Sequence, residues 1–116
     1  DPNALKEWYK KHLGLDWAGQ SSFGFKWRER NHPDSIGRTE LGIFKETTKY
    51  FDPSTKEFML NFRVKNFDEL LKKLKSEGVH VEEKVESYEY GKFGWIVDPE
   101  GNKIELWEPV DSVLEK

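Results

Sequence analysis

The chain has 116 residues, no cysteine and a formal net charge of −3, with acidic and basic side chains interspersed along it. A chain of this length suits one domain that buries roughly two thirds of the surface its unfolded form exposes. The lack of cysteine excludes disulfides and thiolate metal sites. Scattered charges argue against a nucleic-acid partner. The same lack of cysteine suits a reducing cytosol, so we expect a cytoplasmic location. Because the apolar runs are too short to span a bilayer, we expect no membrane partner.

The first half of the sequence predicts one helix followed by two strands. Apolar side chains recur at helical spacing in residues 1–15, and Gly14 is a usual helix stop. Alternating apolar and polar residues predict strands at 21–30 and 39–46. The residues between them, 31–37, are rich in Pro, Asp, Asn and Gly, which indicates a loop.

The second half predicts a strand, a helix and further strands after a connection at 47–57. Residues 66–79 have the apolar spacing of a helix, with Asn66 as the expected cap and Gly78 as the stop. The strand-like segments are 58–64, 79–85, 91–97 and 103–109.

The last two strands are expected to form a hairpin. Residues 98–101 place Pro where φ must be pre-set and Gly where φ must be positive, as a tight turn requires. Pairing of Val97 with Lys103 then sets the register, and side chains alternate between the two faces. On one face this register surrounds the carboxylate of Glu105 with three aromatic side chains, namely Phe93, Trp95 and Trp107. A carboxylate in such surroundings is a candidate functional group.

The sequence also contains signs of an internal repeat. Gly14 and Gly78 end the two predicted helices 64 positions apart, and Glu40 and Glu105 lie in similar contexts 65 positions apart. The chain therefore reads as two copies of one module. Only the second copy has a strand before its helix, so we expect the opening strand of the first module to be absent.

The segments "DPNALKEWYKKHLGL", "FMLNFRVKNFDELLKKLKSEGV" and "GKFGWIVDPEGNKIELWEP" make the chain resemble the vicinal oxygen chelate superfamily. This superfamily includes glyoxalase I, bleomycin-resistance proteins and extradiol dioxygenases. The resemblance implies an α+β fold in which two βαβββ modules form a curled mixed sheet around a cavity. It implies one domain over 1–116, with modules at 1–50 and 57–109 and a tail at 110–116. Dimers are common in this fold, so we expect a homodimer.

The resemblance also implies where a metal would bind. Glu105 matches the carboxylate ligand of the last strand, and Glu40 matches its counterpart in the first module. The ligand position in the second module's first strand falls on Met59, whose thioether suits hard and borderline divalent metals poorly. The fourth ligand belongs to the absent strand. We therefore expect no intact metal site and no cofactor; the alternative is Ni, Zn, Fe or Mn held by Glu40 and Glu105.

The predicted cavity face offers a binding site instead. Strand alternation directs one set of side chains of 58–64 toward the helices, namely Phe58, Leu60, Phe62 and Val64. The opposite set joins the final hairpin to give the expected ligand-binding residues: Met59, Asn61, Arg63, Phe93, Trp95, Glu105 and Trp107. A mostly aromatic concavity with a few polar groups suits a small planar or cationic molecule. The alternative is that Arg63 and Glu105 form a structural ion pair.

Three function classes stay open on the sequence alone. The first is a protein of the bleomycin-resistance type that binds a small aromatic or cationic molecule without chemistry. The second is a metal-dependent lyase, isomerase or dioxygenase, which needs a metal to polarise substrate oxygens. The third is a purely structural or partner-binding module. The expected absence of an intact metal site favours the first class, and whether the chain is an enzyme stays open.

Overall fold

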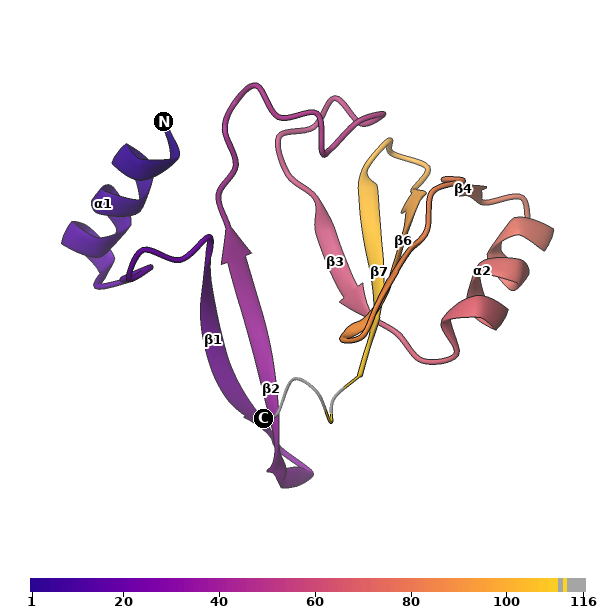
Figure 1. Ribbon diagram of the computed structural model, residues 1–116, viewed down its shortest axis with the longest axis horizontal. Coiled ribbons are helices and arrows are strands. Elements are labelled where there is room, and N and C mark those ends of the chain that lie inside the picture. Colours follow the sequence, from indigo (N-terminus) through magenta and orange to yellow (C-terminus); the bar gives the residue numbers. More distant parts are fainter. Residues whose placement is uncertain (111, 113–116) are drawn as a thin grey trace. The chain divides into compact units, whose positions relative to one another are not determined.

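The computed structural model describes residues 1–110 and 112, and the chain divides into two compact units, Asp1–Thr48 and Lys49–Lys116. The described residues form two helices and seven strands, which confirms the α+β class (Figure 1). None of the helices in this described part is both long enough and apolar enough to cross a membrane.

The first unit begins with helix α1, Pro2–Leu13, as the sequence predicts. The carboxylate of Asp1 accepts hydrogen bonds from the backbone N–H groups of Asn3 and Ala4, at 3.0 and 3.3 Å. These bonds satisfy N–H groups that have no partner within the helix. Gly14 ends the helix in the left-handed conformation, with φ 71°, which glycine adopts without a Cβ penalty.

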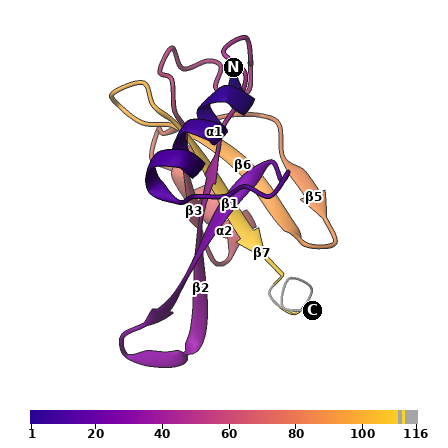
Figure 2. The same ribbon diagram turned by 90° about the vertical axis from the view of Figure 1, so that its left-hand side faces the viewer.

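Strands β1, Ser22–Glu29, and β2, His32–Gly42, form an antiparallel hairpin (Figure 2). The loop predicted at 31–37 is wrong, because β2 already begins at His32. Proline is tolerated here because the register shifts between Arg28 and Glu29, and Pro33 lies opposite this irregularity. The Arg28 Nη1 group donates to the Pro33 carbonyl at 2.7 Å, so a side chain replaces regular strand pairing.

The second unit contains one mixed sheet in the order β3-β7-β6-β4, with β5 paired to β6. Strand β3 runs parallel to β7, and the other pairs are antiparallel. The predicted strands at 58–64 and 79–85 are shorter than expected, and β5 was not predicted. The strands are β3 Leu60–Arg63, β4 His80–Val81, β5 Glu86–Tyr88, β6 Gly91–Val97 and β7 Lys103–Pro109.

Helix α2, Phe67–Ser76, packs against one face of this sheet (Figure 1). The core consists of Phe67, Leu71 and Leu106, and Phe67 is only 1 % exposed. Gly94 allows the close approach, since a Cβ there would lie 2.8 Å from Cζ of Phe67. Asn66 precedes the helix in the left-handed conformation, but its side chain makes no capping hydrogen bond. The predicted helix is confirmed with Asn66 at its N-cap position, although this residue caps without a side-chain hydrogen bond.

Strand β3 is an edge strand, and this changes one prediction about burial. Phe62 pairs with Leu106, so it lies on the helix side of the sheet as expected. Three of the four side chains expected to pack on the helices are nevertheless exposed, namely Phe58, Leu60 and Phe62. The core under α2 involves side chains of β4, β6 and β7. Among the four, only Val64 packs against it.

The hairpin of β6 and β7 has the predicted register. Val97 pairs with Lys103, and each later pair follows in step to Gly91 and Pro109. The turn closes through the Gly101 N–H, which donates to the Asp98 carbonyl at 3.0 Å, and Gly101 has φ 82°. The hydrogen bond from the Asn102 side chain, with backbone N–H donors, holds the pKa of Asp98 below its ordinary value.

Candidate functional site

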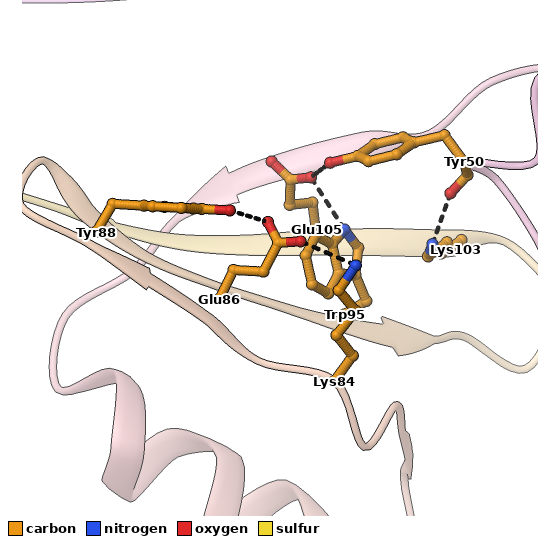
Figure 3. Close-up of polar contacts among 7 residues, drawn as sticks. All are labelled: Tyr50, Lys84, Glu86, Tyr88, Trp95, Lys103 and Glu105. Atoms are coloured by element: carbon orange, nitrogen blue, oxygen red, sulfur yellow. Dashed lines mark hydrogen bonds and ion pairs between the residues drawn. The ribbon is translucent and has the colours of Figure 1, made fainter.

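The sheet of the second unit has a face opposite α2, which we call the aromatic face. Strand alternation and the register of β3, β6 and β7 place on it Asn61, Arg63, Phe93, Trp95, Lys103, Glu105 and Trp107. The pairing of Glu86 with Phe93 adds residues of β5 to the same face. Figure 3 shows Glu86, Tyr88 and Glu105 on the side of the sheet away from the helix.

Glu105 is a buried carboxylate on the aromatic face, with 6 % of its surface exposed. Its oxygens accept hydrogen bonds from the Tyr50 hydroxyl, from Nδ2 of Asn61 and, at 2.9 Å, from Nε1 of Trp95. Glu105 lies in β7, where it pairs with Asn61 of β3 on one side and with Trp95 of β6 on the other. A buried charge needs such donors because it has lost its hydration. The sequence prediction for Glu105 is confirmed as to its face and its aromatic neighbours.

Tyr50 was not predicted from the sequence. It lies in the connection before β3, and its hydroxyl reaches Glu105 while its backbone carbonyl accepts from Lys103 Nζ at 2.6 Å (Figure 3). Burial, followed by the hydrogen bond to Glu105, raises the pKa of the Tyr50 phenol. The phenol therefore stays a neutral donor. No local pattern marks this tyrosine, because its partner lies 55 positions away.

The aromatic rings form a continuous series. Phe93 and Trp107 are stacked, with centroids 5.7 Å apart and planes 9° apart. Tyr88 and Tyr90 are stacked at 5.1 Å and 7°, and both present edges to Phe93 at 6.0 and 6.1 Å. Such arrays present large planar surfaces to flat molecules. Gly91 makes room for Trp107, because a Cβ at Gly91 would lie 2.6 Å from its Nε1.

Glu86 adds a second carboxylate to the aromatic face. It forms an ion pair with Lys84 at 3.0 Å and accepts from the Tyr88 hydroxyl at 3.0 Å (Figure 3). The Lys84 contact, and then the Tyr88 hydrogen bond, lowers the pKa of Glu86 below its ordinary value. Sequence reasoning missed Glu86, since the strand that positions it was not predicted.

Comparison with known proteins assigns the chain to a family. The sequence matches the Glyoxalase/Bleomycin resistance protein/Dioxygenase superfamily over residues 1–106. The chain belongs to this superfamily. No curated protein matched the sequence.

Three solved structures are similar to this chain at low sequence identity. The chain is similar to one described as an NAD-dependent benzaldehyde dehydrogenase from Legionella pneumophila, with a TM-score of 0.55 and 16 % identity over 93 % of this chain and 90 % of that one. It is also similar to a member of the Glyoxalase/bleomycin resistance protein/dioxygenase superfamily from Sphaerobacter thermophilus DSM 20745. That comparison has a TM-score of 0.40 and 19 % identity over 93 % of this chain and 88 % of that one. A glyoxalase family protein from Enterococcus faecalis has a TM-score of 0.40 and 20 % identity over 93 % of this chain and 89 % of that one. At 16 % identity, the likeness to the Legionella structure concerns the fold alone.

The surroundings of Glu105 do not fit the metal site that superfamily membership implies. Its three described partners act as hydrogen-bond donors, and the indole N–H of Trp95 has no lone pair to offer a metal. Within residues 1–110 and 112, no group of three or more His, Cys, Asp or Glu side chains could hold an ion. Glu40, the other expected ligand, is exposed, and its carboxylate contacts Ser22 at 2.7 Å and Arg38 at 3.2 Å.

The remaining predicted site residues lie at the edge of the aromatic face. Arg63 Cζ lies 5.8 Å from the ring centroid of Trp107, which is cation–π geometry. The described hydrogen-bond partners of Glu105 are Tyr50, Asn61 and Trp95, and the ion pair between Arg63 and Glu105 stays a prediction. Met59 is half-buried and directly precedes β3.

Two surface hollows in the described residues lie against α1 instead. One has a volume of about 420 Å³ and is lined by residues from Asp1 to Tyr9. The other has a volume of about 200 Å³ and is lined by residues from Asn3 to Gln20. Neither includes a predicted site residue, so the cavity around Glu105 stays a prediction.

Proposed function

We propose that this superfamily member is a binding protein that holds a small planar molecule, aromatic or cationic, on the aromatic face without a metal ion. The observation that carries the proposal is the stacked series of rings beside the buried carboxylate of Glu105. Ring faces attract flat apolar surfaces and cations, and one buried charged group gives such a site its orientation.

The charge at Glu105 supports a cationic ligand over an anionic one. Its described hydrogen-bond partners, Tyr50, Asn61 and Trp95, are all neutral. These donors stabilise the carboxylate but leave its net charge in place. In a partly desolvated site that charge attracts a cation more strongly than it would in water.

Isothermal titration calorimetry with 2-naphthamidine, a planar aromatic cation, tests this function. We expect saturable binding to the wild-type chain and weaker binding of the matched anion 2-naphthoate. Phe93→Leu keeps an apolar side chain but removes the stacked ring, and should weaken 2-naphthamidine binding by about tenfold.

The matched control is Phe62→Leu, which removes an exposed ring on the helix side of the same sheet. This variant should bind 2-naphthamidine like the wild type. Equal losses in both variants, or no saturable heat with the wild type, would contradict the proposed function.

No contact of the described residues favours the alternative of a metal-dependent lyase, isomerase or dioxygenase. The cytoplasmic location and the homodimer expected from the sequence stay predictions.

A further inference from the structure

The rings of Tyr50 and Trp95 form two perpendicular walls, which we call the Tyr50–Trp95 corner. Their centroids are 6.2 Å apart and their planes make an angle of 89°. The Tyr50 hydroxyl and the Trp95 indole N–H both donate to Glu105 (Figure 3). The corner is therefore held in shape by the same carboxylate that lies beside it.

The corner already contains a cation from the chain itself. The ammonium nitrogen of Lys103 lies 5.2 Å from the Tyr50 centroid and 5.3 Å from the Trp95 centroid. It also donates to the Tyr50 carbonyl at 2.6 Å. Distances within about 6 Å of two ring centroids are those at which a ring quadrupole attracts a cation. The position of Lys103 thus shows which chemistry the corner accommodates.

We propose that the Tyr50–Trp95 corner is a binding site for an organic ammonium group, and that Lys103 is its built-in competitor. This inference deepens the proposed function and rests on it, since the corner belongs to the aromatic face. The walls offer two ring faces, and their hydroxyl and indole N–H groups already donate to Glu105, so the corner suits a methylated ammonium better than a metal ion. The neighbouring carboxylate disfavours an anion.

Lys103 sets the affinity because it is tethered beside the corner. An external ammonium has to displace a side chain that is present at high effective concentration. Removing the charge of Lys103 should therefore expose the site to a cation added from solution. Lys103→Gln removes the charge and keeps an N–H donor for the Tyr50 carbonyl.

The experiment titrates tetramethylammonium chloride into the ¹⁵N-labelled chain and follows the indole N–H signal of Trp95. Sodium chloride at equal concentration is the reference for ionic strength. We expect Lys103→Gln to bind tetramethylammonium about tenfold more tightly than the wild type. The matched control is Lys92→Gln, because the Lys92 ammonium pairs with Asp68 of α2 at 2.9 Å. This control should bind like the wild type.

Lys103→Met is the second variant. It also removes the charge, and it shows whether an effect of Lys103→Gln is specific to the glutamine side chain. Adding Glu105→Gln to either variant should weaken the binding again, since the carboxylate no longer attracts the cation. If neither Lys103 variant binds more tightly than the wild type, or sodium chloride moves the Trp95 signal equally, the inference is overturned.

The two proposals fail separately. Wild-type binding of 2-naphthamidine that depends on Phe93, with no gain in the Lys103 variants, would retain the proposed function and overturn the competitor role. Tetramethylammonium binding to the Lys103 variants without any 2-naphthamidine binding would support the corner and overturn the wider planar site.

Discussion

The Tyr50 hydroxyl donates a hydrogen bond to the Glu105 carboxylate, which lies 55 positions later in the chain. This bond joins the connection before β3 to the middle of β7. Asn61 and Trp95 complete the donors around the same carboxylate. The four side chains therefore form one polar group on the aromatic face, and changing any of them should affect the others.

Replacing Glu105 with Gln should destabilise the second unit. The amide has the shape of the carboxylate, but its NH₂ group would face side chains that are themselves donors. We expect the free energy of unfolding to fall by about 1–3 kcal/mol in urea denaturation. Glu89→Gln, at an exposed position, is the control. An equal effect in both variants would contradict the proposed importance of these hydrogen bonds.

The contribution of Tyr50 should depend on alkaline pH. Its pKa in the folded chain is raised by burial and by Glu105, whereas the unfolded value is about 10. Stability from the neutral phenol is therefore fully present below about pH 10 and is lost as the pH rises toward the folded pKa.

The measurement compares urea midpoints of the wild type and Tyr50→Phe between about pH 7 and pH 11. The difference should stay constant up to about pH 10 and decrease above it. A difference that is unchanged or larger at the alkaline end would show that the phenol is not the neutral donor described here.

Gly94→Ala should separate α2 from the sheet. The new Cβ would lie 2.8 Å from Cζ of Phe67, which is fully buried and has no room to move. We expect a loss of about 1–3 kcal/mol in the free energy of unfolding. Gly42→Ala is the control, because the nearest atom there is 3.8 Å away. Thermal unfolding of the two variants decides the point, and similar melting temperatures would contradict the packing account.

Zinc and nickel should not bind the chain tightly. The described groups around Glu105 present protons rather than lone pairs, and Met59 occupies the matching ligand position in the sequence. Calorimetric titration with either ion at micromolar concentration should give no saturable one-to-one transition. Such a transition, if abolished by Glu105→Gln, would contradict this prediction and support the alternative function of a metal-dependent enzyme.

The sequence was sufficient for the final hairpin because two local signals agree there. The turn at Asp98 to Gly101 fixes where the strands reverse, and side-chain alternation then decides which face receives Glu105. The helices were also predictable, since their apolar spacing ends at Gly14 and Gly78, both with positive φ.

Other features depend on contacts that no local pattern contains. Tyr50 lies in a connection of turn-like composition and obtains its role only from Glu105 in the folded chain. The exposure of Phe62 follows from the edge position of β3, which alternation alone does not reveal. The strand at His32 to Gly37 exists because a shift in register accommodates Pro33.

The most direct test of the binding proposal is a ¹H–¹⁵N spectrum of the tryptophan indole groups during titration with 2-naphthamidine. Trp95 and Trp107 lie on the aromatic face, whereas Trp8 lies on α1. The account predicts saturable shifts of the Trp95 and Trp107 signals while the Trp8 signal stays in place. Shifts confined to Trp8, or no saturable shift of Trp95 and Trp107, would contradict it.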